Sequence, residues 1–427
     1  MIKKVTALRH ESRANSGFWS LADQGTVSLG NFLTNILLAR KLTPHEYGEY
    51  AILLGVLLVI YGAHGAMVTY PLSLQGASES RDGLRLLTAF SLWLTTGIGL
   101  LFGAGLIVAC WVFGKASLGL WAAGAIFFWI AQETIRRGLM AHMRFRDAMW
   151  GDALSYLGQA TVVLVLAHTG RLSIEGAFGA IALTSAAGAV LQFAQMGIRS
   201  LRVQKAWLLL RRFWNLGQWM VLSNFTGVFS SQFFPWALAF LRGAPLAGAF
   251  QALSNVVAVT NPIYATVANL IIPASARANS EGGTKSAFHE AIRYGAQGAL
   301  FVFPYLAAVL LWPRHVLSIL YGRDSSYASF TTALCIFAVA QFVYYLAIIL
   351  ATLLNALGQS RTNFSILAIS ALVSMIVGVP LIIWKGLLGA TATLTIGILL
   401  RAALIGAAAR KEVLGARADR LHYQEIS

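Results

Sequence analysis

Twelve long hydrophobic stretches divide the chain, and short polar connections separate them. Most of the stretches reach the roughly 20 apolar residues that a helix needs to cross a bilayer. We predict membrane-spanning helices at residues 17–40, 50–75, 86–113, 118–134, 153–167, 174–196, 214–241, 247–272, 294–312, 329–354, 364–384 and 387–409. The pattern predicts an all-α polytopic membrane protein.

A weak internal repeat suggests that these helices form two halves. The sequence FWSL at 18–21 opens the first stretch, and FWNL at 213–216 opens the seventh. Each of these helices then leads through a short turn to a new helix, at YGEY (47–50) and at AGAF (247–250). We therefore predict two six-helix lobes, residues 1–198 and 214–427, joined by a basic linker at 199–213, with a short basic tail at the end. Parallel repeats of this kind recur in secondary transporters.

The basic residues indicate an orientation in the membrane. Most of the 32 Lys and Arg residues fall on every second connection, and such an excess marks the cytoplasmic loops of membrane proteins. Both termini are therefore expected in the cytoplasm. The net charge of +16 is explained by orientation, so no nucleic-acid partner is expected. Only 11% of the residues are charged, against about 25% in soluble domains. Twelve spans of about 20 residues use more than half of the chain, which leaves no room for a large soluble domain.

Polar residues inside the hydrophobic stretches are the first functional candidates, because such residues usually face the interior of a helix bundle or a wet cavity. On the first stretch, Gln24, Ser28, Asn31 and Asn35 fall within about 60° of one helix face, and Asp23 and Thr34 extend that face. The other candidates for a cavity are Tyr61, His64, Asn224, Gln251, Asn255, Gln341 and Tyr345. We interpret the set as the lining of a water-accessible cleft between the lobes. The alternative for each residue is an interhelical hydrogen bond, which stabilises by about 0.6–2 kcal/mol.

Three titratable residues are candidates for a role in transport, and the sequence allows two interpretations of each. Asp23 either binds H⁺ or Na⁺ for coupling, or pairs with a nearby Arg. His64 either titrates near neutral pH or is a neutral, hydrogen-bonded packing residue. Arg401, in the last stretch, either extends to the cytoplasmic surface or attracts an anionic lipid head in the cleft. A further group, Glu133 with Arg136 and Arg137, is interpreted as an ion pair at the membrane interface.

The sequence carries no signature of an enzyme. It lacks a phosphate-binding loop, a metalloprotease His-Glu pair and paired carboxylates on a cavity face. No cofactor or metal is expected, and the energy source is expected to be an H⁺ or Na⁺ gradient or the membrane potential. A membrane polymerase or ligase stays as an alternative, because the connection at 313–327 holds Arg314, His315, Arg323 and Asp324.

Several motifs resemble those of the polysaccharide exporters. NFLTNILLAR at 31–40 followed by LTPHEYG at 42–48 is similar to the first-span signature of that family. LYG at 320–322 with SYA at 326–328 resembles the turn before its tenth span, and LNALGQSR at 354–361 resembles the loop after it. The family stands with the multidrug and toxin extrusion pumps and the lipid-linked oligosaccharide flippases.

The resemblance implies a fold, a substrate and a location. The implied fold has two lobes that alternate between inward-open and outward-open states around a central cavity. The implied substrate is a polyprenyl-diphosphate-linked oligosaccharide, a repeat unit of O-antigen, capsule or exopolysaccharide, flipped across the bacterial cytoplasmic membrane. Membrane lipids, and a polysaccharide polymerase with its assembly proteins, are the implied partners. A drug or metabolite antiporter of the same fold, coupled to a cation through an indispensable carboxylate, is the main alternative.

Overall fold

The computed structural model describes residues 2–198 and 206–426, and these residues are almost entirely helical. The chain divides into two compact units, Met1–Phe229 and Ser230–Ser427. The prediction of an all-α polytopic membrane fold is confirmed. Nine single helices and one bent pair are long and apolar enough to cross a membrane among the described residues. The expected stretches at 17–40 and 214–241 lie within helices α1 and α9.

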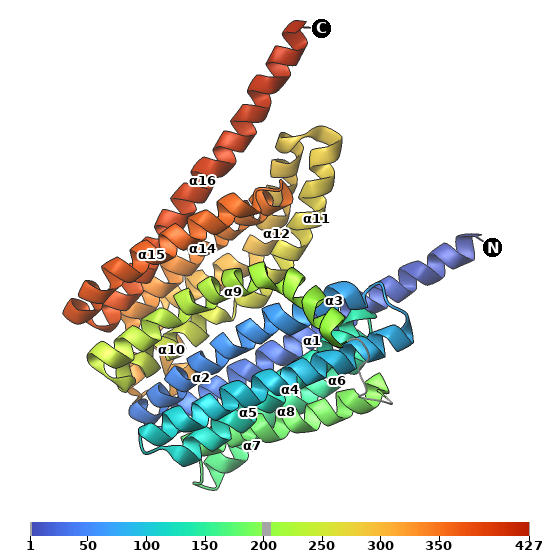
Figure 1. Cartoon of the computed structure of the whole chain (residues 1–427). Coiled ribbons are helices and arrows are strands. Elements are labelled where there is room, and N and C mark those ends of the chain that lie inside the picture. Colours follow the sequence, from blue (N-terminus) through green and yellow to red (C-terminus); the bar gives the residue numbers. More distant parts are fainter. Residues whose placement is uncertain (1, 199–205, 427) are drawn as a thin grey trace. The chain divides into compact units, whose positions relative to one another are not determined.

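Unit 1 is built from the first eight helices and the start of α9 (Figure 1). Two helices contain π-helical turns, η1 and η2, that interrupt their regular hydrogen bonding. The elements are α1 (Ile2–Lys41), α2 (Pro44–His64), η1 (Gly65–Thr69), α3 (Tyr70–Gly76), α4 (Arg81–Val112), α5 (Ala116–Ala141), α6 (Phe145–Asp152), η2 (Ala153–Leu157), α7 (Gly158–His168) and α8 (Ile174–Met196).

Unit 2 contains the remaining elements and the end of α9. They are α9 (Ala206–Arg242), α10 (Ala244–Ala258), α11 (Asn261–Gly282), α12 (Thr284–Leu311), α13 (Pro313–Tyr321), η3 (Ser326–Ser329), α14 (Thr331–Ala356), α15 (Ser360–Lys385) and α16 (Leu387–Ile426). Helices α10 and α11 bend by 50° relative to each other. The second membrane-spanning segment is therefore irregular in both units, at η1 in unit 1 and at this bend in unit 2.

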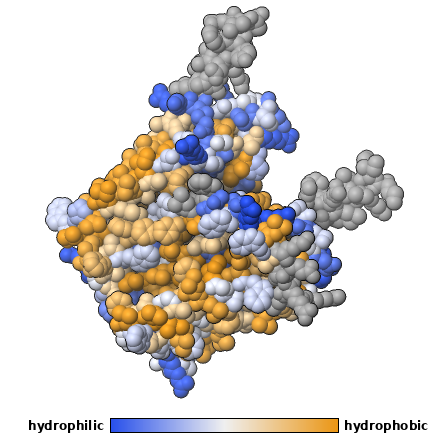
Figure 2. All heavy atoms as spheres, in the orientation of Figure 1, coloured by the Kyte–Doolittle hydropathy of each residue, from blue (hydrophilic) through white to orange (hydrophobic). Residues whose placement is uncertain are grey.

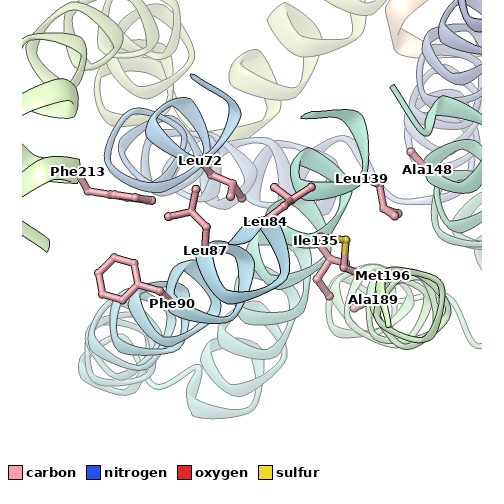
Figure 3. Close-up of a cluster of buried hydrophobic side chains, with 10 residues drawn as sticks. All are labelled: Leu72, Leu84, Leu87, Phe90, Ile135, Leu139, Ala148, Ala189, Met196 and Phe213. Atoms are coloured by element: carbon pink, nitrogen blue, oxygen red, sulfur yellow. The ribbon is translucent and has the colours of Figure 1, made fainter. Parts of the chain in front are cut away.

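The segment expected as a linker is partly helical. Residues 199–205 lie outside the described residues, but α9 begins at Ala206 and Phe213 is buried in the core of unit 1. Its ring packs edge-on against Phe90, with 5.3 Å between ring centroids. Figure 3 shows both rings in a cluster with Leu72 and Leu87. The described part of the expected linker thus contributes to the packing of unit 1.

Small residues allow close helix contacts in unit 1. A Cβ atom on Gly30 of α1 would lie only 2.7 Å from backbone atoms of Tyr156 in η2. A Cβ atom on Gly188 of α8 would lie 2.8 Å from the carbonyl oxygen of Gly151 in α6. These contacts hold α1, α6, η2 and α8 close together, and they bring polar side chains of these helices into one buried site.

The outer surfaces of the helices are apolar. Leu100 and Leu101 on α4 are 63% and 70% exposed, and Ile376 on α15 is 65% exposed. Figure 2 shows hydrophobic residues over much of the visible face. Apolar surface of this extent would be unfavourable in water, whereas in a bilayer it contacts lipid chains.

Candidate functional site

The polar stripe of α1 lies on an accessible side of unit 1. Gln24 and Asn31 are exposed, whereas Ser28 and Asn35 are half-buried. The Asn35 side-chain amide donates a 2.9 Å hydrogen bond to the carbonyl oxygen of Asn31. The expected extension of this face is wrong, because Asp23 and Thr34 are fully buried. Both point to the packed side of the helix, about 100° away from the stripe.

Asp23 takes part in a buried ion-pair network with helix α5. Its Oδ2 accepts a 2.6 Å hydrogen bond from Nη2 of Arg136. Nη1 of Arg136 donates to Oε2 of Glu133 at 3.1 Å, and its Nε contacts Oδ2 of Asp152 in α6. Arg137 donates from Nε to Oε1 of Glu133 at 2.5 Å. The interpretation of Glu133 and the two arginines as an interfacial pair is therefore too narrow, since the side chains of Asp23, Glu133, Arg136 and Asp152 are at most 6% exposed.

Two glutamines complete the surroundings of Asp152. Gln132 of α5 and Gln192 of α8 each donate from Nε2 to Oδ1 of Asp152, at 3.1 Å and 3.0 Å. Gln192 also donates to the carbonyl oxygen of Ala148 at 2.9 Å. Asp152 is thus held from three sides, by one guanidinium and two amides, and the network joins helices α1, α5, α6 and α8.

The network contains one more carboxylate than guanidinium groups. Asp23, Glu133 and Asp152 would carry three negative charges when ionised, against two positive charges on Arg136 and Arg137. Asp23 and Asp152 both contact the same guanidinium, that of Arg136. A buried net charge is costly, and such sites become neutral by taking up a proton or a cation. The charges of this network therefore do not balance when all five groups are ionised.

His64 lies in a second buried cluster of unit 1. Its Nε2 is 2.9 Å from Oγ1 of Thr95 and 3.1 Å from Oγ1 of Thr134, and these two hydroxyls are 2.7 Å apart. His64 is fully buried. This geometry favours the interpretation of a hydrogen-bonded packing histidine. Thr134 is the neighbour of Glu133 along α5, so this cluster directly adjoins the ion-pair network.

Tyr61 and Asn224 are the other candidates in unit 1. The Tyr61 ring stacks on Trp129, with centroids 4.7 Å apart. Trp129 in turn donates from Nε1 to the hydroxyl of Tyr156 at 3.1 Å. Asn224 is half-buried on α9. Tyr61 therefore lies in an aromatic chain that reaches η2.

In unit 2, the candidates on α10 form a local pair. Gln251 donates from Nε2 to Oδ1 of Asn255 at 3.0 Å, one helical turn apart. Asn255 is 9% exposed, and Gln251 is half-buried. Tyr321 of α13 donates to the nearby carbonyl oxygen of Ala252 at 2.8 Å. Some of the hydrogen-bonding groups of α10 are thus paired within unit 2.

A tyrosine cluster brings together Gln341, Tyr345 and Arg401. Tyr264 of α11 packs 5.3 Å from the ring of Tyr345 and 5.8 Å from that of Tyr344, and its hydroxyl donates to the carbonyl oxygen of Gln341 at 3.2 Å. The Tyr345 hydroxyl is bonded to the carbonyl oxygen of Gly295 at 2.6 Å.

Arg401 lies at the edge of this cluster. Its guanidinium carbon is 5.7 Å from the centre of the Tyr344 ring, within the range of a cation–π contact. Its Nε is buried, with no hydrogen-bond partner among the described residues. Arg401 is only half-buried, so its guanidinium group is accessible to an anionic group.

Sequence reasoning missed several members of these clusters. Asp152 was placed in a connection because the fifth stretch was started at residue 153, whereas α6 begins at Phe145. Gln132 and Gln192 lie on predicted spans, yet their relation to Asp152 depends on tertiary contacts. The missed signal was the three acidic residues near the ends of predicted stretches, Asp23, Glu133 and Asp152, in a chain with only 16 acidic residues.

Comparisons with known proteins identify the fold. No family model matches the sequence, and no curated protein matches it. Among solved structures, an inward-facing multidrug resistance MATE family transporter of the MOP superfamily is similar, with a TM-score of 0.80 and 13% identity over 93% of this chain and 99% of the other. The lipid II flippase MurJ matches with a TM-score of 0.70 and 13% identity over 92% of this chain and 87% of the other. A MOP superfamily transporter from Pyrococcus furiosus matches with a TM-score of 0.63 and 10% identity, over 95% of this chain and 96% of the other. The chain therefore has the fold of the MOP-superfamily transporters.

Proposed function

We propose that this protein is a transporter that flips a polyprenyl-diphosphate-linked oligosaccharide from the cytoplasmic to the periplasmic leaflet of a bacterial inner membrane. The observation that carries the proposal is Arg401, a cation inside a membrane helix, placed over Tyr344 beside two further tyrosines. The motif resemblance to polysaccharide exporters and the fold shared with a lipid II flippase support it.

The chemistry of the tyrosine cluster suits such a substrate. A glycan head cannot cross hydrocarbon alone, because its hydroxyls would lose their hydrogen bonds to water. Amide and hydroxyl groups, such as those of Gln341 and Tyr344 in this cluster, can replace these bonds. Arg401 can pair with a phosphate oxygen, since guanidinium–phosphate hydrogen bonds are strong and directional. Outward movement of the anionic head is also favoured by an inside-negative potential, by about 2.3 kcal/mol per charge per 100 mV.

We further propose that Asp23 and Asp152 couple transport to H⁺ or Na⁺. Asp23 and Asp152 share the single positive charge of Arg136. The negative charge that is left over is neutralised when one of these two carboxylates binds a proton or a cation. Taking up and releasing this charge would alter the contacts between α1, α5 and α6. A ligand shifts a conformational equilibrium only through different affinities for the two states, and contacts that change between states supply this difference.

The same network favours a second candidate function, a cation-coupled antiporter for drugs or metabolites. This candidate needs a carboxylate that is indispensable for transport, and Asp23 and Asp152 both qualify by burial. The fold shared with a MATE transporter is equally consistent with it.

Deleting the gene in its host separates the two functions. The flippase proposal predicts that lipid-linked oligosaccharides accumulate on the cytoplasmic leaflet and that surface glycan is lost. Plasmid-borne Arg401→Lys should restore export partly and Arg401→Gln should not, whereas Arg314→Gln, on the exposed part of α13, should restore it fully. Normal surface glycan combined with altered drug tolerance would overturn the flippase proposal in favour of the antiporter.

A further inference from the structure

Unit 2 has an apolar groove lined by residues of three of its helices. It has a volume of about 450 Å³ and lies between α12, α14 and α16. Phe288 and Ile292 of α12 form one wall, Leu346 of α14 contributes another, and Gly406 of α16 is part of the floor. The volume falls within the range of about 300–1,000 Å³ that is usual for small-molecule sites.

The groove is open to the surface of unit 2. Phe288, Ile292 and Leu346 are 36%, 44% and 46% exposed. A Cβ atom on Gly406 would meet no atom within 4 Å, so there is open space beside this lining residue. Because the walls are apolar and the helices cross the membrane, the natural occupant is a hydrocarbon chain from the bilayer.

One charged residue lines the groove. Arg410 lies one turn beyond Gly406 on α16 and is exposed. The ion pairs found in the described part of the chain do not include it. The groove lies near the first turns of α12 and near the end of α14. Lys285 lies at the start of α12, and Arg361 lies at the start of α15, the helix that follows α14. Arg410 is therefore at the level where the apolar part of the helices ends and lipid headgroups begin.

We propose that this groove is a binding site for an anionic phospholipid, with an acyl chain between α12, α14 and α16 and the phosphate at Arg410. Charge complementarity supports the choice, because the apolar walls and the single guanidinium match a lipid with one negative charge. Phospholipids of the surrounding bilayer are in direct contact with a groove that opens to lipid, and they can occupy it. Such a lipid would tie together three helices of unit 2, and this role does not depend on which substrate the protein transports.

Native mass spectrometry of the full-length protein, released from detergent with added lipids, tests the proposal. Phosphatidylglycerol should be retained in preference to phosphatidylcholine. Arg410→Gln should weaken phosphatidylglycerol binding about fivefold, since one basic residue near a membrane surface contributes about 1 kcal/mol to such binding. Gly406→Leu should remove binding of both lipids by filling the groove.

Two control variants distinguish the site from general lipid adhesion. Arg361→Gln removes an exposed charge at the start of α15, and Gly105→Leu adds the same side chain at an open position of α4, where a Cβ would also meet no atom within 4 Å. Both should bind phosphatidylglycerol like the wild type. Equal losses in the controls, or no preference for the anionic lipid, would overturn the proposal. Stronger retention of polyprenyl phosphate than of phosphatidylglycerol would also overturn it, because the groove would then hold the tail of the proposed substrate.

Discussion

Replacing Arg136 tests whether the buried charges of unit 1 depend on each other. The guanidinium of Arg136 faces three carboxylates, and the arginine side chain is only 6% exposed. Arg136→Gln leaves the carboxylates of Asp23 and Asp152 buried without a cation in contact. Removing one partner of a buried ion pair costs about 3–5 kcal/mol, and we expect the upper end of this range because two carboxylates lose their partner.

Asp23→Asn is the matched comparison for Arg136→Gln. It removes the negative charge from the Asp23–Arg136 ion pair, whereas Arg136→Gln removes the positive charge. The four charged groups that remain then balance, two carboxylates against two guanidiniums. The expected cost is the weakening of one hydrogen bond, at most about 1.5 kcal/mol. The double variant should be more stable than Arg136→Gln alone, because one of the two unpartnered carboxylates is gone.

Equilibrium unfolding of the purified variants in mixed micelles measures these differences in the free energy of unfolding. We expect Arg136→Gln to lose at least twice as much stability as Asp23→Asn. Equal losses in the two single variants, or no gain in the double variant over Arg136→Gln, would refute the claim that excess negative charge dominates this site.

Two further predictions concern packing. Gly30→Ala should destabilise the protein by about 1–3 kcal/mol, because the new methyl group would lie 2.7 Å from the backbone of Tyr156; Gly25→Ala on the same helix, with no atom within 4 Å, should be neutral or stabilising in the same unfolding assay. Tyr345→Phe should cost about 1–3 kcal/mol in that assay, because it leaves the buried carbonyl oxygen of Gly295 without the hydroxyl that now lies 2.6 Å away; an unchanged stability would show that this bond is not needed.

The helices were predictable from the sequence because the bilayer imposes a simple rule of length and polarity. The sixth predicted stretch coincides with α8, Ile174–Met196. Helix ends were less predictable, since polar turns such as Phe145–Asp152 continue a helix when tertiary contacts satisfy their side chains. Asp152 was missed for this reason.

The candidate site was only partly accessible to sequence reasoning. Periodicity placed Gln24 and Asn31 on one face of α1, where both are exposed. It placed Asp23 on that face as well, although this residue turns toward Arg136, which lies more than a hundred residues later in the chain. A helical period gives the direction of a side chain, but the pairing partner depends on which helices pack together.

The proposed function rests on movement of a lipid-linked glycan, and transport in proteoliposomes measures this most directly. The purified protein would be reconstituted with a fluorescent polyprenyl-diphosphate-linked oligosaccharide, and transfer of its head between leaflets would be followed by quenching from one side. We expect transfer that requires the protein, speeds up under an imposed H⁺ or Na⁺ gradient and is lost in Arg401→Gln. Absence of transfer by a folded wild-type protein that exchanges drug cations in the same vesicles would contradict it.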